Sequence, residues 1–181
     1  MHRLLLASLL VPFLCTCGRA PETSDAVTSP AFFDLATYMD TEIARLTDGK
    51  ITGDKSITLN GVTESKEDVA INYKTDLLLF RAADINKPAW RDKYETEETA
   101  GSGSHKTTVY TTLDSSLVVQ RLLVEEDQGV PVRIEIDRKT GTVLSDGKHQ
   151  LVYRPGRGYS VTTRQQNRFG DDVDARIDVN W

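Results

Sequence analysis

The sequence predicts an α+β domain, in which a curved antiparallel β-sheet of about seven strands in a meander packs against two N-terminal amphipathic helices. Three observations support this fold class. Apolar residues recur at helical spacing in the first half of the chain. From residue 106 onward they alternate with polar residues, as in strands with one solvated face. Turn sequences divide this second half roughly every 8–12 residues, which is typical of a meander.

Length and composition agree with one water-soluble domain. The chain has 181 residues, of which 39% are hydrophobic and 27% are charged. This mixture excludes collagen-like, low-complexity and multi-span membrane chains. The net charge of -5 gives no bulk attraction for a phosphate backbone, so we expect no nucleic-acid partner.

The first 16 residues have the features of an export signal. Arg3 provides a positive start, and the apolar run of residues 4–14 is too short to cross a bilayer, which requires roughly 20 helical residues. Both cysteines, Cys15 and Cys17, lie at the end of this segment. We therefore expect no disulfide and no cysteine-ligated metal site in the rest of the chain.

The sequence Leu-Cys-Thr-Cys-Gly at residues 14–18 resembles the lipobox of bacterial lipoproteins. The resemblance implies that residues 1–16 are a lipoprotein signal peptide and that Cys17 is acylated after cleavage. The alternative is removal of the leader near Gly18 or Ala20, which would discard both cysteines. Each buried methylene contributes roughly 0.8 kcal/mol, so two or three acyl chains hold a protein at a membrane. We expect a chain anchored in the bacterial cell envelope and facing the periplasm, with residues 17–28 as the lipidated cysteine and flexible tether.

The single domain is expected to span residues 29–181 and to begin with a helix. Ser29 suits the N-cap, Pro30 suits the first turn, and Gly49 is placed to end the helix. The apolar face of this helix is formed by residues in steps of three and four: Phe32, Leu35, Met39, Ile43 and Leu46.

A hairpin and a second helix are expected next. Asn60 and Gly61 favour a type I′ turn between two short strands. Ser65 resembles a helix cap, and apolar residues at positions 69, 73, 77 and 80 predict a second amphipathic helix, which Pro88 ends. Residues 95–105 contain three glutamates and a Gly-Ser run without a large apolar residue, which predicts an exposed connection.

The remaining chain predicts the strands of the meander. Val132, Ile134 and Ile136 alternate with charged residues, and the C-terminal run up to Trp181 alternates in the same way. This pattern places the C-terminus in the sheet. The expected strands cover residues 109–113, 117–124, 132–136, 142–144, 151–153, 159–163 and 173–181.

The sequence contains no recognisable catalytic constellation. His105 and His149 lack the spacing of metal ligands, and we expect both to lie on the surface. The acidic runs flank glycines or turns, where carboxylates are solvated, and no glycine-rich phosphate loop is found. We therefore expect no enzyme activity, no cofactor and no metal site.

The turn around Pro155 is the best candidate for a ligand-binding site. It belongs to the one basic concentration of the chain, which consists of Arg154, Arg157, Arg164 and Arg168. Arg154 and Arg157 would receive an anion such as a lipid headgroup, with Tyr153 and Tyr159 beside them. The alternative is that the arginines pair with carboxylates across the sheet and that the tyrosines belong to the core.

Two functions are compatible with these features. The first is a lipid-anchored, non-catalytic envelope protein that binds a hydrophobic ligand in a cleft between sheet and helices. In outline, this predicted architecture resembles the half-barrel carriers and receptors that handle lipoproteins in the bacterial envelope. The second is a structural or accessory lipoprotein that binds another envelope protein and has no small-molecule site. The expected partners are thus the membrane, through the lipid anchor, and either a lipid or an envelope protein.

Overall fold

The computed structural model describes residues 30–181. The predicted signal peptide, the predicted lipidation site at Cys17 and the predicted tether lie outside the described residues. The elements occur in the following order: α1 (Leu35–Asp48), β1 (Thr52–Leu59), β2 (Val62–Ala70), α2 (Tyr73–Asp76), α3 (Leu78–Arg81), the 3₁₀ helix η1 (Pro88–Trp90), β3 (Tyr94–Ala100), β4 (His105–Thr112), β5 (Val119–Asp127), β6 (Val130–Gly141), β7 (Ser145–Arg154), β8 (Gly158–Asn167) and β9 (Val173–Asn180). None of the helices in residues 30–181 has the length and apolar character needed to cross a membrane.

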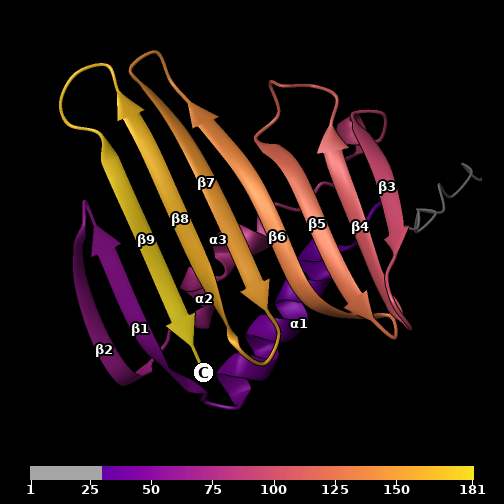
Figure 1. Ribbon diagram of the computed structural model, residues 1–181, viewed down its shortest axis with the longest axis horizontal. Helices are drawn as coiled ribbons and strands as arrows, with labels where there is room; N and C mark the ends of the chain where they lie inside the picture. Colours follow the sequence, from indigo (N-terminus) through magenta and orange to yellow (C-terminus); the bar gives the residue numbers. More distant parts are fainter. Residues whose placement is uncertain (1–29) are drawn as a thin grey trace, which may run out of the picture.

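The strands form one antiparallel sheet of nine strands, in the order β2-β1-β9-β8-β7-β6-β5-β4-β3 (Figure 1). Strands β3 to β9 follow one another as a meander. The β1–β2 hairpin comes earlier in the chain, and it joins the far margin of the meander because β1 pairs with β9. In this pairing Ile57 lies opposite Ile177. The first and last strands of the described chain therefore lie side by side, and β2 and β3 form the two edges of the sheet.

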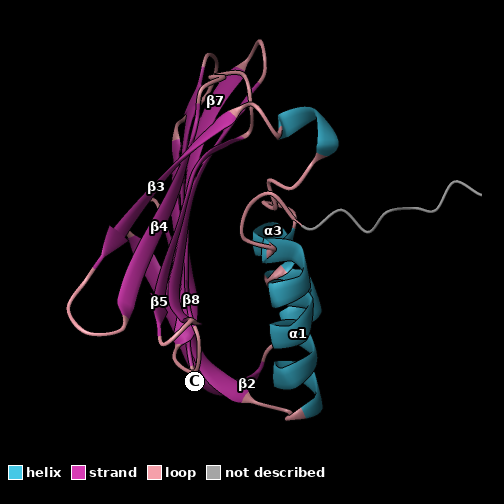
Figure 2. Cartoon of the chain, turned by 90° about the vertical axis from the view of Figure 1, so that its right-hand side faces the viewer, coloured by secondary structure: helices cyan, strands magenta, loops and turns pink. Residues whose placement is uncertain are grey.

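The helices cover one face of the sheet, which we call the inner face, and the opposite side is the outer face. Figure 2 shows α1 and α3 together on this inner side. Side chains alternate between the two faces along each strand. The core between helices and sheet is formed by Leu35, Met39, Leu46, Leu77 and Phe80 from the helices, with Leu122, Ile134, Ile136, Leu151, Tyr153 and Val179 from the strands. Removal of these side chains from water is the main contribution to stability.

Helix α1 follows the predicted apolar spacing but begins later than Ser29. The side chain of Asp34 caps it, since Asp34 Oδ1 accepts the backbone N–H of Thr37 at 3.0 Å. Gly49 is the C-cap, as predicted. Because the cap is at Asp34, Pro30 lies outside the helix.

The predicted hairpin turn is confirmed. Asn60 and Gly61 have φ values of 48° and 86°. Positive φ at both central positions is what a type I′ turn requires. The turn sets Leu59 opposite Val62 in the β1–β2 ladder.

The predicted fold class was wrong in the number of strands and in the helices. The sheet has nine strands rather than about seven, and α1 is accompanied by two four-residue helices rather than by a second amphipathic helix. Residues 65–70 belong to β2. The helical spacing arose because Val69 of β2 precedes three core residues, Tyr73, Leu77 and Phe80, which α2, α3 and their junction direct inward.

Two further expectations about strands were wrong. Residues 95–105 were expected as an exposed connection, but Tyr94–Ala100 form the edge strand β3, which pairs with β4. An edge strand with both faces in water needs no apolar alternation, because its ladder hydrogen bonds come from the backbone. Residues 142–144 were expected as a strand, but they form the turn between β6 and β7, in which the N–H of Thr142 donates to the carbonyl of Ser145 at 2.8 Å.

Candidate functional site

The structure separates the four residues predicted to bind a ligand at the β7–β8 turn. Tyr153 and Tyr159 point to the inner face and are buried in the core. Arg154 follows Tyr153 in the strand, so it points to the outer face, where it is exposed. Arg157 is exposed in the turn itself. The tyrosines and the arginines therefore do not form one site.

The hydroxyl of Tyr153 forms part of a buried polar contact with α1. It donates to Glu42 Oε2 at 2.6 Å, and Arg45 donates to both oxygens of the same carboxylate at 2.9 and 3.0 Å. Burial by itself would raise the pKa of Glu42. The hydrogen bonds from Arg45 and Tyr153 outweigh burial, and the pKa lies below its ordinary value of 4.5. Glu42 is therefore a carboxylate that is fully engaged within the protein.

A second tyrosine–carboxylate contact lies on α2. Tyr159 donates to Asp76 Oδ2 at 2.5 Å, and Lys55 of β1 lies 2.8 Å from the same oxygen. Burial, followed by the hydrogen bond to Asp76, raises the pKa of Tyr159 well above its ordinary value of 10. The phenol stays protonated and donates at every physiological pH. The contact holds α2 against the sheet. Because the hydroxyl of Tyr159 is engaged with Asp76, it does not point to a ligand site at the β7–β8 turn.

The C-terminal Trp181 closes this region. Its ring lies 5.4 Å from that of Tyr73, 6.2 Å from that of Tyr153 and 6.1 Å from that of Tyr159, measured between centroids. These distances are typical of packed aromatic rings. The predicted attachment of the C-terminus to the sheet is confirmed, because β9 reaches Asn180 and the N–H of Trp181 donates to the carbonyl of Arg157 at 3.0 Å.

An apolar strip leaves the core and crosses the inner face toward the β2 edge. It consists of Val161, Ile177, Ile57, Leu59 and Val62. Val161 lies opposite Ile177, Ile177 lies opposite Ile57, and Leu59 lies opposite Val62. Val161 and Ile177 are partly buried against the core, whereas the side chains further out are 44% exposed at Ile57, 52% at Leu59 and 69% at Val62. The helices therefore use only part of the inner face.

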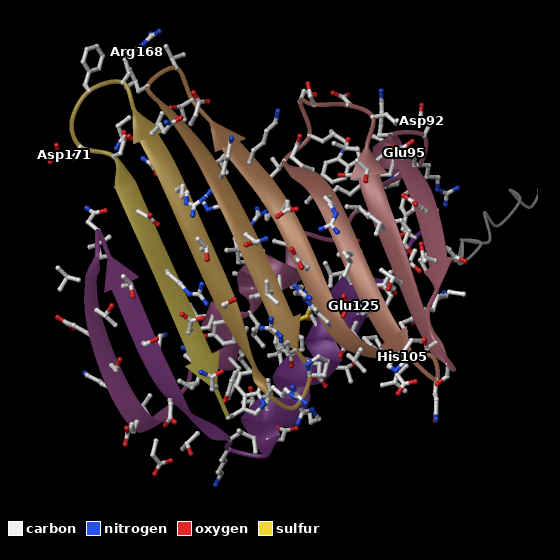
Figure 3. All side chains as sticks on the ribbon, viewed as in Figure 1. Asp92, Glu95, His105, Glu125, Arg168 and Asp171 are labelled. Atoms are coloured by element: carbon white, nitrogen blue, oxygen red, sulfur yellow. The ribbon has the colours of Figure 1, made fainter. Side chains whose placement is uncertain are left out.

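The outer face, which is turned to the viewer in Figure 3, carries many nitrogen- and oxygen-bearing side chains. Arg121 lies opposite Asp137, and Glu125 lies opposite Arg133. The corresponding nitrogen–oxygen distances are 3.5 and 3.7 Å. Glu135 joins the two pairs, because Arg133 lies 2.6 Å and Arg121 lies 3.8 Å from its carboxylate. Opposite charges placed directly across a ladder stabilise a sheet.

The two histidines differ in their surroundings. His105 is exposed, as predicted, and its ring lies 4.0 Å from the carboxylate of Asp127. His149 is half-buried on the inner face, where its two ring nitrogens lie 3.0 Å from the hydroxyls of Thr140 and Thr163. Burial, with a smaller contribution from nearby Arg138, lowers the pKa of His149 below its ordinary value of 6.5. Within residues 30–181, no three His, Cys, Asp or Glu side chains are grouped to hold a metal ion.

The sequence contained part of the information about the apolar strip. Ile57, Leu59 and Val62 could be assigned to a hairpin, but their exposure depends on the pairing of β1 with β9 and on the place of α1, which periodicity does not specify.

Comparison with protein families, with curated proteins and with solved structures finds no match for this chain, so its function is inferred from its own residues.

Proposed function

We propose that this chain is a non-catalytic accessory protein, anchored in the bacterial cell envelope through Cys17, that binds another envelope protein with its apolar strip. The observation that carries the proposal is the graded exposure of the strip, from partly buried Ile177 to Val62 at 69%. Contiguous exposed apolar side chains mark interaction sites on water-soluble proteins. The anchor is supported by the resemblance of residues 14–18 to a lipobox.

The shape of the strip favours a protein partner over a small ligand. A small-molecule site encloses most of its ligand, roughly 70–90% of the ligand surface. Leu59 and Val62 instead lie next to the β1–β2 turn, at the edge of the sheet, where one side is open. The space beneath α1 is occupied by core side chains such as Met39, Leu46 and Leu151, which are fully buried.

A hydrophobic ligand is the second candidate. It is supported by the continuity of the strip with the core, since Val161 and Ile177 pack against buried residues. An acyl chain lying along the strip would contact the protein from the core margin to Val62. This ligand would lie on the inner face beside the helices rather than between them and the sheet.

Photo-crosslinking tests the proposal. The full chain is expressed in a bacterium that acylates lipoproteins, with a photoreactive residue at position 59 or, as the matched control, at position 58. The side chain of Thr58 points to the outer face of the same strand. We expect one envelope protein to be crosslinked from position 59 and not from position 58, and we expect Leu59→Asp to abolish crosslinking from position 62.

Native mass spectrometry and organic extraction of the purified full chain distinguish the second candidate. If a stoichiometric lipid co-purifies and no protein is crosslinked from position 59, the chain binds a hydrophobic ligand and not an envelope protein. Equal crosslinking from both positions would contradict the accessory function, and the absence of both a lipid and a crosslink would contradict both functions. The anchor is tested separately, because Cys17→Ala should move the chain into the soluble fraction and remove any acyl label.

A further inference from the structure

We propose that the outer face carries a binding site for a phosphate-bearing ligand, formed by Lys139 of β6, Lys148 of β7 and Arg164 of β8. We call these three residues the cation row. Lys139 lies directly opposite Lys148, and Lys148 lies directly opposite Arg164. The site lies on the opposite face of the sheet from the apolar strip, so it does not depend on the function proposed above.

All three side chains of the cation row point outward. On β7, Tyr153 points to the inner face, where its side chain contacts α1. Side chains alternate along a strand, and Lys148 lies an odd number of residues from Tyr153, so Lys148 points to the outer face. Arg164 stands in the same relation to the inward-pointing Tyr159 on β8. Lys139 faces outward because it pairs with Lys148. Neighbouring strands lie about 4.8 Å apart, so the row extends over roughly 10 Å.

The cation row departs from the pattern of the surrounding face. Elsewhere on this face the facing charges are opposite, as in Arg121 with Asp137. Like charges placed directly across a ladder destabilise a sheet. Among residues 30–181, no carboxylate lies within 4.0 Å of the charged nitrogens of the row. Two like-charge pairs, Lys139 with Lys148 and Lys148 with Arg164, are therefore kept side by side without an ion pair to any of the three in the described chain, which is expected where an anion binds.

A groove is associated with the row. It has a volume of about 360 Å³, and its outward-facing lining includes Asp137, Lys139, Lys148, Gln150, Thr162 and Arg164. An adjoining groove of about 440 Å³ shares Lys148 and Arg164. The two lysines and the arginine thus line recessed surface, in which a ligand is held by more than one strand.

The carboxylates near the row form no ion pair with it in the described chain. Asp137 lies 3.5 Å from Arg121 and is already paired. Asp146 and Asp174 line the adjoining groove, and Asp174 lies opposite Arg164 in the ladder, but neither oxygen pair approaches the row within 4.0 Å in the described chain. They border the site on one side and limit the direction from which an anion enters.

The residue types favour phosphate. Arginine binds phosphate oxygens through two parallel N–H groups, and lysine supplies a compact positive charge. The hydroxyl of Thr162 and the amide of Gln150 add neutral donors to the same groove. A phosphate group with two negative charges matches a row of three cations better than a single carboxylate does. The same chemistry is offered by a phospholipid headgroup and by a soluble phosphate compound.

Calorimetric titration with inorganic pyrophosphate tests the site. The full chain is purified in a non-ionic detergent and a phosphate-free buffer, and is compared with Lys148→Gln. We expect the variant to weaken pyrophosphate binding about tenfold, which is the effect of losing one charged hydrogen bond. Lys66→Gln is the control, because it removes the same charge from an exposed position on β2 and should change the affinity less than about twofold.

Thermal unfolding distinguishes a binding role of Lys148 from a structural one, because the two roles predict opposite changes in melting temperature for Lys148→Gln without ligand. Without ligand, Lys148→Gln should melt at a higher temperature than the natural chain because it relieves repulsion in the row. Pyrophosphate should raise the melting temperature of the natural chain and not that of the variant. If Lys148→Gln fails to fold, Lys139→Gln takes its place with the same expectations.

Detergent micelles containing phosphatidic acid distinguish the two sources of phosphate. Competition of these micelles with pyrophosphate would assign the site to a headgroup, and unaffected pyrophosphate binding would assign it to a soluble ligand; both support the proposal. The proposal is overturned if pyrophosphate does not bind the natural chain, if Lys66→Gln weakens binding as much as Lys148→Gln, or if Lys148→Gln lowers the melting temperature in the absence of ligand.

Discussion

Two carboxylates, the buried Glu42 and the half-buried Asp76, connect the helices to the sheet. Glu42 of α1 accepts from Tyr153, and Asp76 of α2 accepts from Tyr159. A charge removed from water is costly unless its hydrogen bonds are satisfied, and here a phenol hydroxyl and a cation contact each carboxylate. Apolar packing alone permits several placements of a helix on a sheet, whereas these contacts select one.

The Glu42 contact predicts a specific dependence of stability on pH. At neutral pH, Glu42→Gln should lower the free energy of unfolding by about 1–2 kcal/mol, because hydrogen bonds to a charged acceptor are replaced by neutral ones. The pKa of Glu42 in the folded protein lies below its ordinary value of 4.5. The ionised carboxylate therefore stabilises the fold fully above pH 4.5, and this stabilisation is lost as the pH falls through the folded pKa.

The difference in unfolding free energy between the natural chain and Glu42→Gln should therefore shrink as the pH is lowered below 4.5. Urea unfolding at a series of pH values measures it. Glu64→Gln is the control, because Glu64 is exposed on β2. A difference that stays constant across this pH range would show that the ionised form of Glu42 has no special role.

At the scale of elements, the turn between β7 and β8 depends on two glycines for different reasons. Gly156 and Gly158 both have positive φ, at 70° and 146°. A Cβ atom at Gly156 would meet nothing within 4 Å. A Cβ atom at Gly158 would lie 2.0 Å from the carbonyl oxygen of Val179 in β9. Close pairing of β8 with β9 therefore excludes any side chain at position 158.

These two glycines give a matched pair of variants. Gly156→Ala should cost about 1 kcal/mol, because only the backbone conformation is penalised. Gly158→Ala should cost about 3 kcal/mol or more, because β8 and β9 must also separate. Chemical denaturation measures both values. Equal costs would mean that the contact between position 158 and β9 is relieved without loss of pairing.

Local chemistry determined which elements were predictable from sequence. The Asn60-Gly61 turn requires positive φ at adjacent positions, and few other residue pairs allow it. The apolar face of α1 repeats over four turns. In strand β3 only Tyr94 is buried, and apolar and polar residues do not alternate. The strand forms because its backbone pairs with β4, which the sequence of β3 does not show. The same holds for β2, in which only Val69 is partly buried.

The candidate sites were less accessible to sequence analysis than the fold. Arg154 and Arg164 belong to one basic stretch, but one lies at the β7–β8 turn and the other lies near the far end of β8. Lys139, Lys148 and Arg164 come from three strands, and only the ladder register aligns them. Register is set by turns and packing along the whole meander, which a local pattern does not contain.

At the scale of the whole molecule, the pairing of β1 with β9 holds the hairpin to the meander. Gly53 of β1 lies close to β9, and a Cβ atom there would be 2.7 Å from the carbonyl oxygen of Asn180. A two-stranded hairpin is marginally stable alone. The protection of β1 and β2 therefore depends on their contact with the last strand.

Hydrogen exchange of Gly53→Ala tests this dependence. We expect faster exchange of the β1 and β2 amides, while the amides of β5 and β6 keep their protection, since those strands lie several positions away in the sheet. Ser56→Ala is the control on the same strand, because it adds no atoms. Uniformly faster exchange over the whole sheet would mean that hairpin and meander unfold as one unit.

The same pairing has a consequence for the time course of folding. Ribosomes make a chain from its N-terminus, so the segment that becomes β1 is available long before its neighbour β9, the last strand of the described chain. Contacts between residues far apart in sequence form slowly because a long loop must close first. The left-hand margin of the sheet in Figure 1 is thus completed only after β9 has been made. A nascent chain therefore exposes the backbone hydrogen-bonding edge of β1 until β9 pairs with it.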